Sequence, residues 1–249
     1  MELTGLQKRA VENILDLYNP NQKTICEFKA PTGSGKTLMS SAFISEMILR
    51  NSNDKFIFVI ATPSSSDLPL FFEQKINKYK IDLPYSKFEV EYIKSPSSAQ
   101  NDKTESISKI IPQQNKVYIF GKSSFGKGRI LSEYQIIDDF ILSAMADDFK
   151  LVYIRDEAHI GGNRPDNGEQ AQNFENLMQN NASFVLKMTA TPTNSPSVSK
   201  VILTEKELNN PLLNENKWLL KTHAVSLLDS NLENDKILEH AISDRKSVV

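Results

Sequence analysis

The sequence predicts an α/β fold, a mostly parallel sheet with helices on both faces, on three observations. Short apolar runs bounded by turn-forming residues alternate with segments of helical periodicity along most of the chain. FIFVIA, at 56–61, is apolar throughout, as expected of a strand buried on both faces. The glycine-rich stretch APTGSGKT, at 30–37, lies between a strand candidate and a helix candidate, which is where phosphate-binding loops occur.

The first part of the chain predicts a helix, a strand and a second helix. Apolar side chains recur at helical spacing over 4–17, and Asn19-Pro20 ends that helix. TICEFK, at 24–29, is a short strand candidate. Over 36–50 the apolar residues again fall on one side of a helix, namely Met39, Phe43, Met47 and Ile48.

The middle of the chain continues the alternation. A helix is expected over 68–79, and the alternating pattern of FEVEYI predicts a strand at 88–93. Residues 94–115 are rich in Ser, Gln, Asn, Lys and Pro, which predicts a surface excursion. VYIF, at 117–120, is the next strand candidate.

Two more helices and two more strands complete the pattern. The helices are expected over 133–149 and 169–179, and the strands at 151–154 (LVYI) and 183–189 (SFVLKMT). Beyond Pro196 the pattern weakens, so the strand at 183–189 is expected to be the last.

Composition restricts the class of protein. The 249 residues suffice for one large domain or two small ones, and 39% apolar with 24% charged residues excludes a disordered chain. With a net charge of −2, any nucleic-acid contact must come from a local patch. Cys26 is the only cysteine, so no internal disulfide can form and a cytoplasmic location is expected. The start lacks a signal peptide and no apolar run could span a bilayer, so no membrane partner is expected.

The stretch at 30–37 has the residue types that a phosphate-binding loop requires. Gly33 and Gly35 permit backbone conformations closed to other residues, so that loop N–H groups can point at a phosphate. Lys36 supplies a positive charge for the outer phosphates, and Thr37 supplies a hydroxyl for magnesium. The strict pattern begins with glycine, whereas this chain has Ala30; the alternative is a Gly-Ser turn at a helix start. The candidate residues for binding ATP and Mg²⁺ are Pro31, Thr32, Gly33, Ser34, Gly35, Lys36 and Thr37.

A second cluster lies in LVYIRDEAHIGG, at 151–162, where a strand runs directly into two carboxylates. A phosphate-binding loop needs a carboxylate for its metal at the end of a neighbouring strand. Asp156 meets that need, through a water, and Glu157 is the candidate general base for the attacking water. The alternative is that both carboxylates are solvated, and Arg155 is open among an ion pair, a phosphate contact and a solvent-facing side chain. The candidate catalytic residues are therefore Lys36, Asp156 and Glu157, with Thr37 and Asp156 as metal ligands.

These stretches together resemble a known family. APTGSGKT at 30–37, DEAH at 156–159 and TATP at 189–192 occur in the order and approximate spacing of the Walker A loop, the Walker B box and the coupling motif of superfamily 2 helicases and translocases. LTGLQKRAV at 3–11 resembles the segment whose glutamine reads adenine, and ATPSSSDLPLFFEQ at 61–74 resembles a stretched form of the segment that grips the nucleic-acid backbone. The resemblance implies a RecA-like P-loop NTPase domain.

Within the superfamily, the chain most resembles the motor (restriction) subunit of type III restriction enzymes. The LQ start, RDEAHIGG and the long polar insert before the fourth strand support this assignment. Type I motors and repair helicases share the short motifs, so they stay open as alternatives.

The resemblance implies roles for four further residues, each with an ordinary alternative. Gln7 would hydrogen-bond to the adenine edge, since an amide offers both a donor and an acceptor, or it is an exposed glutamine at a helix start. His159 would link the metal site to TATP, or it is solvated beyond a strand end. Thr189 and Thr191 would relay the nucleotide state to a second domain, or they are β-forming residues that close a strand.

A basic stretch without acidic residues, KVYIFGKSSFGKGRI at 116–130, is a candidate nucleic-acid contact. Backbone N–H groups and hydroxyls with nearby Lys and Arg suit phosphates. In the family, the loop after this strand touches the bound nucleic acid. A flexible surface loop is the alternative.

The resemblance implies an ATP-hydrolysing first motor domain of a DNA translocase or helicase over 1–200, followed at 201–249 by a helical segment that leads toward a missing second motor domain. Turnover by this domain alone is expected to be slow, since the second domain supplies an arginine finger. The expected partners are nucleic acid, with duplex DNA favoured, the second motor domain and a modification methyltransferase subunit. No nuclease constellation is visible. An RNA helicase of the same superfamily and a nucleotide-gated binding module that does not hydrolyse ATP are the alternatives.

Overall fold

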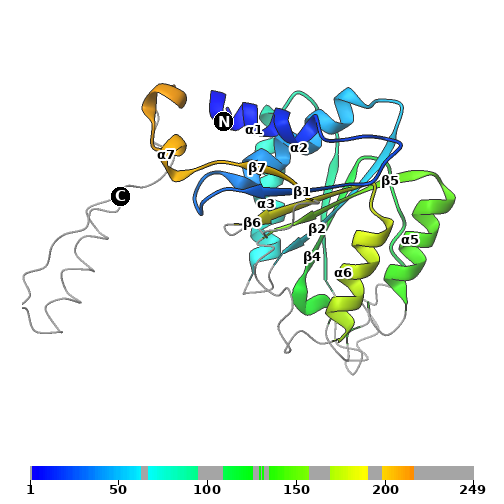
Figure 1. Cartoon of the computed structure of the whole chain (residues 1–249). Coiled ribbons are helices and arrows are strands. Elements are labelled where there is room, and N and C mark those ends of the chain that lie inside the picture. The colour runs from blue at the N-terminus through cyan, green and yellow to red at the C-terminus, as the bar shows by residue number, and fades with distance from the viewer. Residues whose placement is uncertain are drawn as a thin grey trace, which may run out of the picture.

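A seven-stranded parallel sheet forms the centre of the protein. The computed structural model describes residues 2–62, 67–94, 109–125, 129, 131, 135–156, 169–189 and 198–215. Within them the strand order is β3-β4-β2-β5-β6-β1-β7, and every strand pair is parallel. Helices cover both faces of the sheet (Figure 1). The predicted α/β fold class is therefore confirmed.

The elements follow one another in the alternating order that the sequence predicts. The strands are β1 (Thr24–Lys29), β2 (Lys55–Thr62), β3 (Glu89–Ile93), β4 (Lys116–Gly121), β5 (Phe149–Arg155), β6 (Phe184–Thr189) and β7 (Ser199–Ile202). The α-helices are α1 (Gly5–Leu15), α2 (Lys36–Arg50), α3 (Leu68–Tyr79), α5 (Ile136–Ala146), α6 (Glu169–Asn181) and α7 (Glu205–Leu208). Short 3-10 turns are η1 (Lys80–Asp82), η2 (Lys122–Phe125) and η3 (Pro211–Leu213).

The central strand β2 separates two apolar cores. Phe58 and Ile60 face one core, Ile57 and Val59 face the other, and all four are completely buried. Alternate side chains of a strand point to opposite faces, so a strand covered on both sides must be apolar throughout. The strand predicted from FIFVIA is confirmed.

The helices divide between the two faces according to the direction in which the chain crosses the sheet. Apolar residues of α1, α2 and α3 belong to one core, and those of α5 and α6 belong to the other (Figure 1). The crossovers through α2 and α3 run toward β3, whereas those through α5 and α6 run toward β7. Right-handed crossovers require this change of face when the direction reverses. No helix in the described part of the chain has the length and apolar character needed to cross a bilayer.

The strands and helices predicted between residues 4 and 189 are confirmed, with ends shifted by a few residues. The helix predicted over 133–149 ends at Ala146, because Phe149 already begins β5. The prediction that no strand follows 183–189 is wrong, because β7 pairs with β1 at the sheet edge. Only Val201 of its four residues is buried, which leaves too little pattern to recognise. The boundary expected at residue 200 falls within β7, and residues 95–108 of the expected excursion lie outside the described residues.

Several buried acids ionise only at high pH. Burial raises the pKa of the Cys26 thiol to about 12, and it raises the pKa of the Tyr118 phenol to about 12. Burial also raises the pKa of Tyr153, and the nearby Glu175 carboxylate acts in the same direction. The folded state favours the protonated form of each group. Their contribution to stability is therefore complete at neutral pH and is lost as the pH rises above the pKa that each group has in the unfolded chain.

We expect the free energy of unfolding to fall steeply above about pH 9, with Cys26 contributing first because an ordinary thiol has a pKa of about 8.5. In Cys26→Ala the fall between about pH 9 and about pH 10 should be shallower by about 1 kcal/mol per pH unit. Urea titrations followed by circular dichroism measure both slopes. The substitution also changes packing, but this shifts the curve of the variant by an amount that does not depend on pH, and so leaves its slope unchanged. Equal slopes would contradict the raised thiol pKa.

Candidate functional site

Three neighbouring strands bring predicted site residues to one edge of the sheet. β1 leads into the phosphate loop, defined here as residues 30–37, β5 ends immediately before Asp156, and β6 ends at Thr189. β6 lies between β1 and β5, and because the strands are parallel their carboxyl ends share an edge. Neighbouring strands lie about 4.8 Å apart, so the axes of β1 and β5 are about 10 Å apart.

The phosphate loop has the backbone geometry expected from its glycines. Gly33 and Gly35 have φ angles of 84° and 88°, in the left-handed region that favours glycine. The loop begins with a hydrogen bond of 3.2 Å from the N–H of Ala30 to the carbonyl oxygen of Thr189. It reaches α2 at Gly35, which is the N-cap of that helix. The unpaired N–H groups of the first helical turn therefore adjoin the loop.

Polar side chains of the loop fit a phosphate group. Lys36 is 9% exposed, and its Nζ donates to the carbonyl oxygen of Ala30 at 3.3 Å. The Ser34 hydroxyl is buried and has no hydrogen-bond partner within the protein. A buried hydroxyl without a partner is unfavourable, and a phosphate oxygen would supply one. Thr37, in the first turn of α2, is partly buried.

The oxygen donors at this edge also fit magnesium. The Thr37 hydroxyl and the Asp156 carboxylate are the hard ligands that this ion prefers, and in nucleotide sites it takes one or two protein ligands besides phosphates and water. The backbone N–H of Asp156 donates to the carbonyl oxygen of Ala61 in β2 at 2.9 Å, which fixes the position of Asp156 beyond β5. In the described ranges, no group of three or more His, Cys, Asp and Glu side chains could hold a metal.

Gln7 is buried against the phosphate loop. It is 4% exposed, and its Nε2 donates to the carbonyl oxygen of Ser34 at 2.9 Å. Its Oε1 accepts from the N–H of Thr4 at 3.0 Å, and its own N–H donates to the Thr4 hydroxyl at 3.4 Å. Thr4 and Gln7 thus form the capping box that begins α1. The alternative of an exposed glutamine at a helix start is wrong, because α1 places this amide under the loop.

Arg155 is paired with α6. Its Nη1 lies 3.1 Å from Oε1 of Glu175, and the two side chains are only 16% and 19% exposed. Tyr153 donates through its hydroxyl to the other carboxylate oxygen of Glu175 at 2.7 Å. Glu175 therefore ties α6 to two residues of β5 just before Asp156. Of the three possibilities left open for Arg155, the ion pair is confirmed.

The ion pair belongs to a row of charges on the face of the sheet that α6 covers. Strand register places Arg155 beside Lys187 of β6, and Lys187 beside Glu27 of β1. Burial lowers the pKa of Lys187; the carboxylate of Glu175 opposes this shift, and the Arg155 guanidinium adds to it. Two cations thus lie between two acidic side chains, Glu175 and Glu27.

Part of the basic stretch at 116–130 is a core element. Phe125 is 4% exposed and stacks on Phe174 of α6, with ring centroids 3.6 Å apart. Ser124 is buried as well. Phe125 therefore anchors η2 to α6 and is not available to stack on a base. A nucleic-acid contact by the rest of this stretch stays a prediction.

The remaining predicted site residues differ in whether the structure describes them. The carbonyl oxygen of Pro31 accepts from the N–H of Ser34 at 3.2 Å, and Thr32 is exposed. Three of them lie outside the described residues, namely Glu157, His159 and Thr191. Of the stretch at 61–74, residues 63–66 also lie outside them, and the rest forms the end of β2 and the start of α3. Their roles stay predictions.

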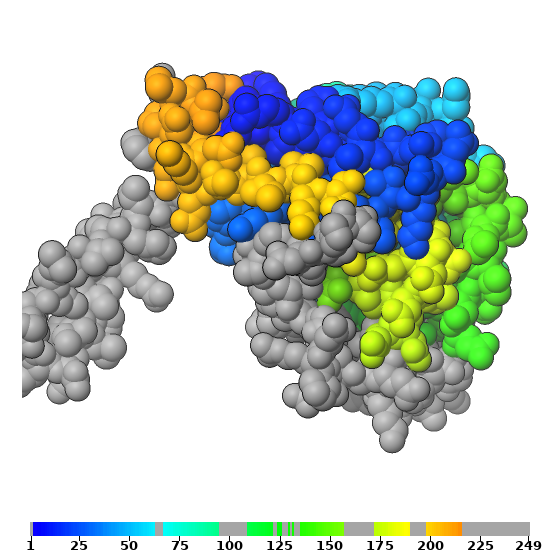
Figure 2. All heavy atoms as spheres, in the orientation of Figure 1, coloured from blue at the N-terminus to red at the C-terminus, as the bar shows by residue number. Residues whose placement is uncertain are grey.

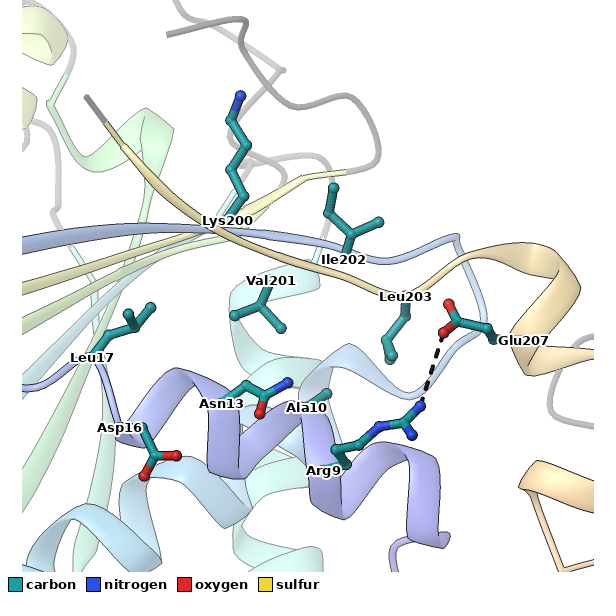
Figure 3. Close-up of a pocket in the computed structure, with 10 residues that line it drawn as sticks. All are labelled: Arg9, Ala10, Asn13, Asp16, Leu17, Lys200, Val201, Ile202, Leu203 and Glu207. Atoms are coloured by element: carbon teal, nitrogen blue, oxygen red, sulfur yellow. Dashed lines mark ion pairs between the residues drawn. The ribbon is translucent and has the colours of Figure 1, made fainter. Parts of the chain in front are cut away.

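A groove of about 620 Å³ lies between α1, β7 and α7 (Figure 3). Its lining consists of Arg9, Ala10 and Asn13 of α1, Asp16 and Leu17 just after that helix, Lys200 to Leu203, and Glu207. Arg9 and Glu207 form an ion pair of 3.8 Å between α1 and α7 (Figure 3). No residue of the phosphate loop lines this groove, so it is separate from the predicted nucleotide site.

Sequence reasoning missed two kinds of contact at this edge. Thr4 followed three residues later by Gln7 is a capping-box signature, so the sequence itself contained a signal for that pair. The contact of Glu175 with Arg155 depends on how α6 packs against β5, and no spacing in the sequence indicates it.

Comparison with known families gives one match. The family described as "Type III restriction enzyme, res subunit" matches residues 1–194. No curated protein sequence matches the chain.

Solved structures of helicases resemble the chain at low sequence identity. The UvsW helicase from bacteriophage T4 is 15% identical, with a TM-score of 0.47, and the match covers 82% of this chain and 60% of that one. S. cerevisiae Dbp5 bound to Nup159, Gle1, IP6 and ADP is 18% identical, with a TM-score of 0.48, and the match covers 84% of this chain and 50% of that one. The DEAD-box helicase Mss116 bound to ssRNA and UDP-BeF is 17% identical, with a TM-score of 0.45, and the match covers 82% of this chain and 41% of that one. The match covers less than two thirds of each of these structures.

Replacing Glu175 with Gln should destabilise the protein by about 1–2 kcal/mol, because Arg155 and Tyr153 lose a charged partner in a mostly buried setting. Glu89→Gln is the matched control, since this carboxylate is 74% exposed and lies 3.7 Å from Nζ of Lys116, and it should change stability by less than about 0.5 kcal/mol. Urea denaturation of both variants at neutral pH measures the difference. Equal effects would mean that Glu175 does not clamp β5 to α6.

Proposed function

The chain belongs to the family of the type III restriction enzyme res subunit, and from this membership we propose that it is the first motor domain of an ATP-driven DNA translocase of a restriction system. The main support for the nucleotide site is the phosphate loop. Its Gly33 and Gly35 have left-handed backbone, its Ser34 hydroxyl is buried without a partner, and α2 begins where it ends. A loop of this form collects N–H donors around an anion.

The residues at the sheet edge suit the roles proposed for them. Lys36 would bind the outer phosphates of ATP; its ammonium group already lies at the loop, where it donates to the carbonyl oxygen of Ala30. Thr37 and, through a water, Asp156 would hold Mg²⁺, which when bound neutralises charge on the β- and γ-phosphate oxygens. Glu157 would take a proton from the water that attacks the γ-phosphorus, while the bond to the β–γ bridging oxygen breaks and ADP departs.

Thr189 is the proposed start of the coupling path to a second domain. Its carbonyl oxygen already accepts the first hydrogen bond of the phosphate loop, from Ala30. A displacement of the loop on hydrolysis would therefore also move the end of β6. His159 and Thr191 are the proposed continuation of this path, and Gln7 is proposed to contact adenine.

The nucleic-acid partner is part of the proposal. Duplex DNA is favoured because the matching family is that of a restriction enzyme. A second motor domain and a modification methyltransferase subunit are the proposed protein partners, and the single cysteine favours a cytoplasmic setting. Among the described residues, η2 has no exposed aromatic side chain that could stack on a base, since Phe125 is buried.

Lys36→Ala should weaken Mg·ATP binding by about tenfold or more, because the loop loses its positive charge. Glu157→Gln should keep ATP binding but lower turnover by about 100-fold or more. Calorimetry on this chain measures binding, and phosphate release from the parent protein with its second motor domain measures turnover. Lys8→Ala, an exposed lysine beside Gln7, is the control and should bind normally. Unchanged binding by Lys36→Ala would refute the loop assignment, and turnover insensitive to Glu157→Gln would indicate a module that does not hydrolyse ATP.

ATP turnover by the parent protein should rise when duplex DNA is added and should not rise with RNA of the same length. The physical reason is that a motor completes its catalytic site when the two domains close on their nucleic acid. A coupled ATPase assay with both polymers at equal ionic strength tests this, since backbone binding depends strongly on salt. Stimulation by RNA alone would instead identify an RNA helicase of the same superfamily.

A further inference from the structure

The segment after β7 lies beyond the part of the chain that matches the family. We call residues 204–214 the exit segment; it consists of α7, η3 and the residues around them, and it continues toward residues 216–249. Figure 2 shows this segment, in orange, packed beside the start of the chain, in dark blue. The family match ends at residue 194, so nothing in that match gives the segment a role.

We propose that Asn214 and Thr4 are positioning residues that connect the exit segment to the phosphate loop through Gln7. The nucleotide and the exit segment would then influence each other across α1. The coupling to nucleotide rests on the proposed ATP site, whereas the connection itself is a property of the protein alone.

Asn214 holds the exit segment together and attaches it to α1. It is completely buried. Its Nδ2 lies 2.9, 3.1 and 3.0 Å from the carbonyl oxygens of Glu207, Leu208 and Asn210, so its two N–H groups are shared among three acceptors. Its Oδ1 accepts from the hydroxyl of Thr4 at 3.3 Å. One amide therefore folds the exit segment and contacts the N-cap of α1.

From Thr4 the contacts continue to the phosphate loop. The capping box joins Thr4 to Gln7 by two hydrogen bonds, and Nε2 of Gln7 reaches the carbonyl oxygen of Ser34. Thr4, Gln7, Ser34 and Asn214 are all at most 4% exposed. We call this series, from Asn214 through Thr4 and Gln7 to Ser34, the hydrogen-bond path.

Burial makes the path more than a set of separate contacts. A buried polar group that loses its partner cannot turn to water instead, so movement at one end favours movement of the next group. Gly35 adds a steric contact, since Gln7 Nε2 fills the space that a Cβ atom would occupy there. Phosphate binding that repositions Ser34 and Gly35 would therefore change how firmly the exit segment docks. By linkage, docking of the exit segment would change nucleotide affinity by the same factor.

The exposed ion pair of Arg9 with Glu207 provides a matched control. It also joins α1 to the exit segment, but its atoms are 3.8 Å apart and its side chains are 57% and 35% exposed (Figure 3). It touches neither Gln7 nor the phosphate loop in the described contacts. Arg9→Ala should loosen the surface contact only.

Hydrogen–deuterium exchange of the 249-residue chain without nucleotide tests the path itself. In Asn214→Ala and Thr4→Val, amides of residues 34–40 should exchange about fivefold faster than in the parent, since the first variant removes one buried hydrogen bond from the path and the second removes two. Arg9→Ala should match the parent, and Thr4→Ser, which keeps the hydroxyl, should restore the parent rate. Unchanged exchange in β2 and β5 shows that each variant is folded. Parent-like exchange at residues 34–40 in both Asn214→Ala and Thr4→Val would overturn the proposal.

A second arm adds saturating Mg·ATP and tests the coupling. In the parent and in Arg9→Ala, the exit segment should exchange about fivefold more slowly when nucleotide is bound. In Thr4→Val, which interrupts the path at a residue without a proposed nucleotide contact, the phosphate loop should still be protected by nucleotide, but the exit segment should not respond. Protection of the loop without any response of the exit segment in the parent would overturn the coupling. Absence of loop protection in the parent would contradict the proposed ATP site, while the first arm would still decide the path.

Discussion

The pairing of β1 with β6 is the interaction on which the proposed site depends. Its six aligned residue pairs run from Thr24 and Phe184 to Lys29 and Thr189, and the ladder continues into the phosphate loop through the Ala30 N–H. A register shift of two residues would move the loop by about 6.6 Å relative to β6. Magnesium binds oxygen at about 2.1 Å, so such a shift would separate the ligands proposed to share it. A shift of one residue would instead turn buried side chains of β6 to the wrong core.

The charged row across β5, β6 and β1 is consistent with this requirement. An arginine directly before Asp156 would compete with a metal for the carboxylate if it had no other partner. Glu175 supplies that partner at 3.1 Å, and Tyr153 fixes the orientation of Glu175. The end of β5 is therefore held by side chains on the α6 face, while its last backbone contact, from Asp156 to Ala61, holds it to β2. Polar groups inside this face thus stabilise the strand end through Glu175, which is not one of the proposed metal ligands.

Whether a feature of this fold could be predicted from sequence depends on whether the residues that determine it lie close together in the chain. The strand at FIFVIA was predicted correctly because burial on both faces makes every residue of the segment apolar. The glycines of the phosphate loop were predicted correctly because their left-handed φ angles favour glycine at those positions themselves. β7 was not predicted, because the strand is stabilised by pairing with β1, which lies far away in the sequence. The burial of Gln7 depends on how α1 packs beside the loop, and the burial of Phe125 depends on Phe174. Local patterns therefore gave the elements, while contacts between distant elements decided which polar residues are buried.

Gly35 shows how two requirements meet at one position. Its φ angle of 88° alone favours glycine, and a Cβ atom there would also lie 2.7 Å from Nε2 of Gln7. The start of α1 and the start of α2 are therefore one structural unit, with Gln7 as its common residue. A side-chain amide has two N–H donors and an oxygen with two lone pairs, and the structure uses one donor for Ser34 and one lone pair for Thr4. In the contacts of the described residues, one donor and one lone pair of the amide remain, which is the combination of donor and acceptor that an adenine edge requires. The proposed adenine contact and the observed contact with the loop are thus chemically compatible, provided that adenine approaches the side of the amide that does not face Ser34.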